Sequence, residues 1–117
     1  MKAIKLLATC GLLLGSFAAN AALLECYGDI TRSYISDDGT VYIKSTWKPQ
    51  DYTAMCNVSQ DRLGVNPEVC KGWLTYITTS IVTKKKVVVT YANVPSCTEI
   101  PAYGGSPKPT YIMLMDQ

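Results

Sequence analysis

The sequence predicts a small domain of the α+β class, mainly β with one helix, with its elements in the order β-β-β-α-β-β. Runs rich in β-branched and aromatic residues alternate with turn signals, which is typical of short strands. One segment, residues 66–83, repeats its apolar side chains at helical spacing. Four cysteines beyond the N-terminal region can staple so short a chain. We therefore expect a disulfide-stapled, five-stranded barrel as a single domain over residues 22–117.

The first three strands are expected over residues 24–35, 41–47 and 52–58. A Ser-Asp-Asp-Gly turn signal at residues 36–39 joins the first two strands as a hairpin. Apolar and polar side chains alternate along the second strand, so one of its faces should be buried. Its inward side chains are then Val41, Ile43 and Trp47, and its outward ones are Tyr42, Lys44 and Thr46.

The helix is expected to begin at Asn66, whose side chain can accept backbone N–H bonds, with Pro67 at the first helical position. Glu68 then lies favourably at the positive end of the helix dipole. The apolar stripe expected to face the core consists of Val69, Trp73, Tyr76, Ile77, Ser80 and Ile81, and it is widened by Cys70 and Leu74. Three lysines at residues 84–86 end the helix and are expected to stay solvated.

Two further strands are expected over residues 87–91 and 111–115, with a Pro/Gly-rich loop at 101–109 between them. This element order is that of a small barrel of the oligonucleotide/oligosaccharide-binding (OB) kind. In such barrels the loops that correspond to residues 36–40 and 93–110 flank the binding face. A helix packed across an open antiparallel sheet is the alternative architecture.

The first 21 residues have the features of a secretory signal peptide. Lys2 and Lys5 form a basic start, residues 4–17 are almost entirely apolar, and residues 19–21 form a small-x-small cleavage site, Ala-Asn-Ala. The apolar run is too short to remain as a membrane span. We expect a mature chain that begins near Ala22 and is secreted or periplasmic.

Removal of this segment changes the net charge. The whole chain has 11 basic and nine acidic residues, for a formal charge of +2, and two of the lysines lie in the signal. The mature chain is therefore formally neutral. It lacks the basic excess needed to follow phosphates or an anionic membrane surface, so nucleic acid is not expected as a partner.

Four cysteines remain in the mature chain, Cys26, Cys56, Cys70 and Cys97, and an even number in an exported chain favours two disulfides over free or metal-bound thiolates. Three pairings are open. We favour Cys56–Cys70, which would pin the helix to the sheet through a closed loop worth about 3 kcal/mol. Cys26–Cys97 would then tie the first strand to the connection after the fourth. Alternatively, Leu-Ala-Thr-Cys at residues 7–10 weakly matches a lipobox, which would make Cys10 a lipidated N-terminus.

The chain has no histidine, which removes the commonest general base, the Ser-His-Asp and Cys-His nucleophiles and histidine-based zinc sites. The adjacent carboxylates Asp37 and Asp38 lie in a turn, where such side chains hydrogen-bond the backbone. There is no glycine-rich phosphate loop. We therefore expect no enzymatic activity, no cofactor and no metal site.

The aromatic residues indicate a binding surface. The chain has eight tyrosines and two tryptophans, and its single phenylalanine lies in the signal, so every mature ring carries a polar group. Such rings suit wet interfaces and can stack on sugars. Most are expected to pack in the helix and sheet, but Tyr52 and Tyr103 lie beside turn-rich loops. We take these two as the candidate binding residues, with three polar neighbours: Lys48, Asp51 and Lys108.

The chain resembles the small exported B subunits of bacterial AB-type toxins. The resemblance rests on the signal, the mature length, the cysteines, and the run Cys-Lys-Gly-Trp-Leu at residues 70–74 that leads through a helix to Val-Val-Val-Thr-Tyr at 87–91. It implies an OB-like barrel, assembly into five-membered rings and binding of cell-surface glycans. It carries over no individual sugar-contacting residue.

The sequence therefore supports a secreted, non-enzymatic binding module that recognises a cell-surface glycan or a protein receptor as a subunit of a homo-oligomeric assembly. The alternative is a periplasmic inhibitor or immunity protein that blocks a partner enzyme with a loop such as residues 101–109. Both classes need export and a rigid surface rather than catalytic groups.

Overall fold

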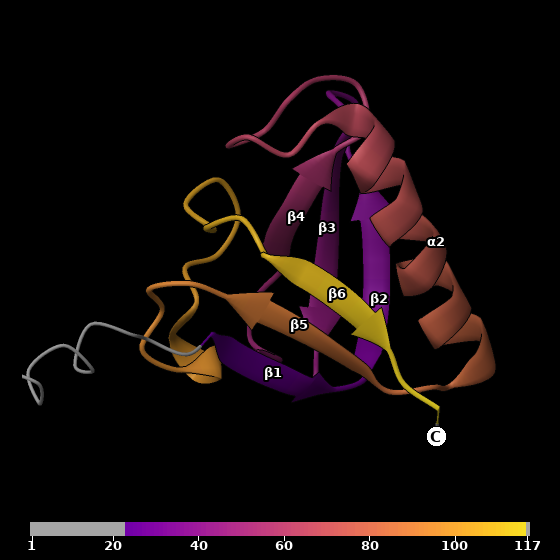
Figure 1. The fold of residues 1–117 in the computed structure, drawn as a ribbon, viewed down its shortest axis with the longest axis vertical. Helices are drawn as coiled ribbons and strands as arrows, with labels where there is room; N and C mark the ends of the chain where they lie inside the picture. The colour runs from indigo at the N-terminus through magenta and orange to yellow at the C-terminus, as the bar shows by residue number, and fades with distance from the viewer. Residues whose placement is uncertain (1–22, 117) are drawn as a thin grey trace, which may run out of the picture.

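Two three-stranded antiparallel sheets and one long helix form the fold in the computed structural model, which describes residues 23–116 (Figure 1). The sheets have the orders β1-β5-β6 and β2-β3-β4, and α2 runs beside β2. The predicted signal peptide, its cleavage site and Cys10 lie outside the described residues. The elements are β1 (Leu24–Gly28), β2 (Ile30–Ile35), β3 (Thr40–Ser45), β4 (Thr53–Asn57), α2 (Pro67–Thr83), β5 (Val87–Tyr91), the 3₁₀ turn η3 (Cys97–Glu99) and β6 (Tyr111–Leu114).

The first predicted strand is two strands, because the chain bends at Gly28 and passes from one sheet into the other. Gly28 has φ +156°, a conformation that glycine adopts most easily, and a Cβ at this position would collide with the Thr46 hydroxyl. Two hydrogen bonds of 3.0 Å hold the bend: Asp29 N donates to Thr46 Oγ1, and Thr46 N donates to Asp29 O. The expected count of five strands was therefore wrong, and the described chain has six.

The expected closed barrel was also wrong, because β4 and β6 form no ladder with each other. The loop before β6 takes the place beside β4 instead: Tyr103 N donates to Tyr52 O at 3.0 Å, and Tyr103 forms a single parallel bridge with Thr53. A segment that contains Pro101, Pro107 and Pro109 lacks the N–H donors that a longer ladder needs. The coarser prediction, a mainly β fold with one helix, is confirmed.

The helix begins as predicted. Asn66 is its N-cap, with Oδ1 accepting from Val69 N at 3.0 Å, and Pro67 is its first residue. Its buried residues, Cys70, Ile77 and Ser80, all belong to the predicted stripe, but Val69 and Tyr76, which were also expected to face the core, are exposed. The disulfide at Cys70 turns that side of the first helical turn toward the sheet.

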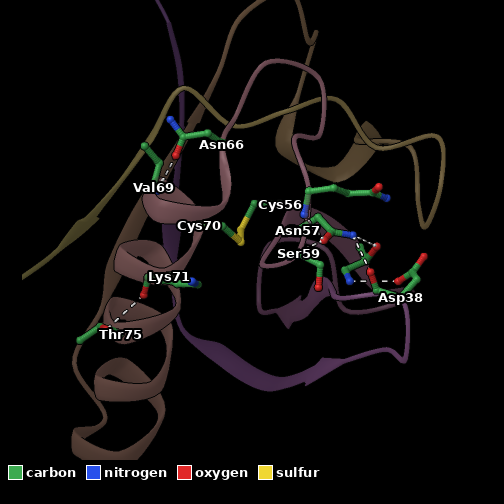
Figure 2. The surroundings of a disulfide bond; sticks show 11 residues. Asp38, Cys56, Asn57, Ser59, Asn66, Val69, Cys70, Lys71 and Thr75 are labelled. Atoms are coloured by element: carbon green, nitrogen blue, oxygen red, sulfur yellow. Dashed lines mark hydrogen bonds between the residues drawn. A yellow bond between two sulfur atoms is a disulfide. The ribbon is translucent and has the colours of Figure 1, made fainter.

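Both favoured disulfides are present. Cys56–Cys70 joins β4 to the first turn of α2 with the Cα atoms 5.5 Å apart (Figure 2). Cys26–Cys97 joins β1 to η3 with the Cα atoms 5.6 Å apart. Three of these cysteines are fully buried in the core that the two sheets and α2 enclose, together with Val41, Ile43, Met55, Ile77, Val87, Val89 and Tyr91.

No helix within residues 23–116 has both the length and the hydrophobicity needed to cross a membrane.

Candidate functional site

Four tyrosines gather on the face of the β2-β3-β4 sheet that points away from the core. We call Tyr34, Tyr42, Tyr52 and Tyr103 the tyrosine cluster. Along β3 the inward side chains are buried, whereas Tyr42 and Lys44 are half-exposed, which is the alternation expected of a strand with one solvated face. Tyr34 is the cross-strand partner of Tyr42 and therefore shares its face.

The rings of the cluster are in mutual contact. Tyr34 stacks on Tyr42 with centroids 4.8 Å apart, and it meets Tyr52 edge-on at 5.0 Å. Tyr103 lies against both of the other rings, 6.1 Å from Tyr42 and 6.5 Å from Tyr52. These are favourable aromatic geometries. The cluster is therefore one connected surface made from β2, β3, the residue before β4 and a distant loop.

Two members of the cluster remain open to solvent. Tyr34 is 41% exposed and Tyr103 is 46% exposed, and Tyr42 and Tyr52 are half-buried beneath them. Tyr34 also borders a groove of about 290 Å³ between β2 and α2. The remaining residues that line this groove are mostly apolar: Ser33, Ile35, Leu74, Thr78, Ile81 and Val82.

Two cationic side chains adjoin the cluster. Lys44 Nζ lies 4.7 Å from the centroid of the Tyr52 ring, a cation–π geometry. Arg32 on β2 is exposed and is the cross-strand partner of Lys44. Neither cation has a carboxylate within 4.0 Å among residues 23–116.

The neighbouring rings also affect the acidity of the cluster. Loss of solvent around the Tyr34 hydroxyl raises its pKa above the ordinary value for tyrosine, and the Tyr42, Tyr103 and Tyr52 hydroxyls add to this shift. Tyr34 therefore stays protonated at physiological pH and can donate as well as accept a hydrogen bond.

The turn at residues 36–39 sets the register that brings Tyr34 opposite Tyr42. Asp38 Oδ1 accepts from Ser36 Oγ and from Thr40 N. Both bonds lower the pKa of the Asp38 carboxyl, and the bond from Ser36 has the larger effect. Asn57 Nδ2 donates to Asp38 O at 3.0 Å and ties the turn to the end of β4 (Figure 2). Asp38 thus has the backbone-bonding role predicted for it.

Ser106 holds the loop that carries Tyr103. It is buried, its Oγ accepts from Ala54 N at 2.9 Å and donates to Pro101 O at 2.7 Å, and its carbonyl accepts from Arg62 Nη2 at 3.0 Å. Tyr103 has φ +53°, a left-handed conformation that is uncommon for a bulky residue. The loop therefore fixes the Tyr103 ring over the sheet at some cost in backbone energy.

The five residues proposed from the sequence fall into three places. Tyr52 and Tyr103 lie together in the cluster. Lys48 and Asp51 form an ion pair at 3.5 Å, and the Lys48 side chain is only 12% exposed, so its charge is already matched. Lys108 lines a different pocket, of about 260 Å³, between the start of α2 and the segment before β6.

Four further site residues, Arg32, Tyr34, Tyr42 and Lys44, were not predicted from the sequence. The signal was available in the predicted hairpin, where Tyr42 and Lys44 are consecutive outward positions of the second strand. Counting back across the turn at residues 36–39 would have placed Tyr34 opposite Tyr42. No comparable feature of the sequence predicts that Tyr103 joins the cluster, because its position depends on the conformation of the loop.

No protein-family model matches the chain, and no curated protein or solved structure compared with it gives a match. The geometry of the tyrosine cluster is therefore the basis on which a function can be assigned.

Proposed function

We propose that this protein is a secreted, non-enzymatic binding module, and that the tyrosine cluster is the surface with which it contacts a cell-surface glycan. The observation that carries the proposal is the gathering of four tyrosines on a solvated sheet face, with two of the rings more than 40% exposed. None of these rings is part of the buried core.

A sugar suits this surface because it has both apolar C–H faces and hydroxyl groups. An exposed aromatic ring offers apolar area for the first, and each phenol can donate and accept a hydrogen bond with the second. Exposed apolar area of this kind is normally limited on a protein surface unless it contacts a ligand or partner. Contacts among the rings reduce their freedom before binding, so less entropy is lost when a ligand orders them.

Export is part of the proposal. The signal-like first 21 residues and the two disulfides both fit an oxidising compartment, the periplasm or the medium. The lack of histidine is the reason for proposing binding rather than catalysis.

We further propose that the domain is an opened relative of the OB barrel and a subunit of a homo-oligomer, like the toxin B subunits it resembles. The bent chain at Gly28 lets the β1 and β2 segments serve two sheets, as one bent strand does in a small barrel. Strand β2 ends its sheet, and Tyr34 and Ile35 are exposed beside the groove between β2 and α2, where a second subunit could contact them.

A glycan array with the mature protein and three surface variants tests the proposed function. Tyr34→Ala and Tyr103→Ala remove the two exposed rings of the cluster, and Tyr27→Ala removes a comparably exposed ring, 57% exposed, from β1 in the other sheet. We expect the first two variants to lose at least about ten-fold in affinity and Tyr27→Ala to bind like the wild type. Equal loss from all three variants, or no bound glycan at all, would refute a glycan site at the cluster.

The alternative, an inhibitor or immunity protein, is favoured by one observation: the anchored loop that presents Tyr103 in a fixed, left-handed conformation. Pre-ordered loops of this kind suit insertion into a partner protein. A monomeric protein that binds no glycan and loses a protein partner through Tyr103→Ala alone would support this function.

A further inference from the structure

Arg32 and Lys44 form an unusual cross-strand pair. They are direct partners in the β2–β3 ladder, so both side chains leave the sheet on the same face. Like charges in this position destabilise a sheet, whereas an opposite charge at either position would stabilise it. The hairpin therefore keeps two positive charges opposite each other, although a negative charge at one of the two positions would make the hairpin more stable.

The rest of the domain does not compensate these charges. The ion pairs of the described chain are Lys48–Asp51, Lys71–Glu68 and Lys86–Asp29, and none includes Arg32 or Lys44. The mature chain is formally neutral, so this pair is a local feature and not part of a general basic excess. Solvent ions or a bound anion must balance it.

The pair adjoins the tyrosine cluster. Lys44 lies over the ring of Tyr52, and Tyr34 follows Arg32 by two residues on the same strand face, which places their Cα atoms about 7 Å apart. A ligand group that reaches both cations would therefore lie beside the exposed Tyr34 ring. Arginine binds planar anions through two parallel N–H bonds, and the lysine adds a second, adjustable charge.

We infer that the ligand of the tyrosine cluster is an acidic saccharide, whose carboxylate or sulfate group is bound by Arg32 and Lys44 while its ring contacts Tyr34. This inference rests on the proposed glycan-binding function and specifies the ligand class. Both anions offer the same chemistry to the pair, and the test separates them.

The test measures binding of matched saccharides by titration calorimetry: one neutral oligosaccharide, the same oligosaccharide with a terminal carboxylated sugar, and the same with a sulfate ester. The wild type is expected to bind at least one acidic form about ten-fold more tightly than the neutral form, with a preference that weakens as salt rises. The form that binds more tightly identifies the anion.

Two variants assign the preference to the pair. Arg32→Gln and the double variant Arg32→Gln/Lys44→Gln should lower affinity for the acidic form about ten-fold or more and leave affinity for the neutral form within about two-fold. Lys71→Gln removes a lysine from the exposed surface of α2 and should change neither affinity. In the double variant, the loss of Lys44 could also disturb the Tyr52 ring. Arg32 is exposed and is not part of the core, so the single Arg32→Gln variant tests the anion contact without that complication.

The outcomes separate this inference from the proposed function. Equal binding of neutral and acidic saccharides, lost in Tyr34→Ala but retained in the Arg32 variants, would overturn the inference and leave the glycan site standing. Absence of binding to every saccharide would overturn both. Loss of the acidic preference in Lys71→Gln as well would show a general charge effect and would also overturn the assignment.

Discussion

The ring of Tyr34 lies nearly parallel to the ring of Tyr42, with the two planes 19° apart and the centroids separated by 4.8 Å. Each ring uses one face in this contact, and Tyr34 also meets Tyr52 in a T-shaped arrangement with the centroids 5.0 Å apart. Tyr34 nevertheless remains 41% exposed. The stack thus fixes the orientation of a ring that stays accessible to a ligand.

Substitution of Tyr34 should separate the effect of its ring from that of its hydroxyl. Tyr34→Phe keeps the stack, so the free energy of unfolding should change by less than about 0.5 kcal/mol. Tyr34→Ala removes two aromatic contacts and should cost about 1 kcal/mol. Urea denaturation measures both. An equal cost for both variants would show that the hydroxyl, and not the stack, stabilises the hairpin.

The buried hydroxyl of Tyr91 should cost stability. Its Oη is fully buried and, among the described residues, has no partner with hydrogen-bond geometry, although Thr53 lies beside it. Tyr91→Phe should therefore stabilise the protein by about 1 kcal/mol at neutral pH. Guanidinium denaturation of the variant and the wild type gives the difference. A loss of stability instead would show that the hydroxyl is satisfied, for example by internal water.

Tyr91 should also make stability fall at alkaline pH. Burial raises the pKa of Tyr91 well above its ordinary range, so the unfolded chain loses this proton at a lower pH than the folded chain. Ionisation of Tyr91 therefore leaves the free energy of unfolding unchanged below about pH 10 and lowers it as pH rises further. The free energy of unfolding of Tyr91→Phe should decline less steeply above that pH than that of the wild type. Identical slopes would contradict the burial of an ionisable phenol.

The two disulfides should differ in their contribution to stability. Replacing Cys56 and Cys70 with alanine opens a loop with a sequence separation of 14 and should cost about 3 kcal/mol. The same change at Cys26 and Cys97 opens a loop with a separation of 71 and should cost about 4 kcal/mol. Thermal unfolding of the two double variants gives the comparison. The reverse order would show that residual structure in the unfolded chain outweighs loop length.

Replacing each of two glycines with alanine should change the free energy of unfolding in opposite directions. Gly28→Ala forces a Cβ against Thr46 at a positive φ and should cost about 1–3 kcal/mol. Gly72 lies in α2, and a Cβ added there would meet no heavy atom within 4 Å, so Gly72→Ala should stabilise the helix by up to about 1 kcal/mol. Chemical denaturation of both variants tests the pair. A neutral Gly28→Ala would mean that the β1–β2 bend does not depend on glycine.

Local chemistry made part of this fold predictable. The cap at Asn66 followed by Pro67, the turn around Asp38 and both disulfide pairs were predicted from residue type and spacing. The bend at Gly28 was not, because it depends on contact with Thr46, which lies 17 positions from Asp29 in the sequence. A glycine inside a run of strand-forming residues is compatible with either a straight or a bent strand.

The candidate site was predictable to a similar extent. Tyr52 and Tyr103 were chosen because they lie beside loops, and they do lie in the same cluster. Tyr42 was predicted to point outward, but the sequence does not show that Tyr52 and the loop of Tyr103 come to lie beside it, so Tyr34 and Tyr42 were missed as site residues. Lys48 was chosen for its charge, and only the structure shows that Asp51 already neutralises it.

The Cys26–Cys97 bond closes a covalent ring that contains β1 through β5 and α2, and it leaves Tyr103 and β6 on a tail outside that ring. Three of the four clustered tyrosines are thus inside the ring, and the fourth is held by non-covalent contacts: the hydrogen bonds of Tyr103 N and Ser106, its ring contacts, and the burial of Ile100 and Ile112 in the core. Detachment of the tail would dismantle a quarter of the cluster while both disulfides stayed intact. A protease that cuts between residues 97 and 103 would therefore leave Tyr103 held only by non-covalent contacts, while the other three tyrosines stayed within a covalently closed chain.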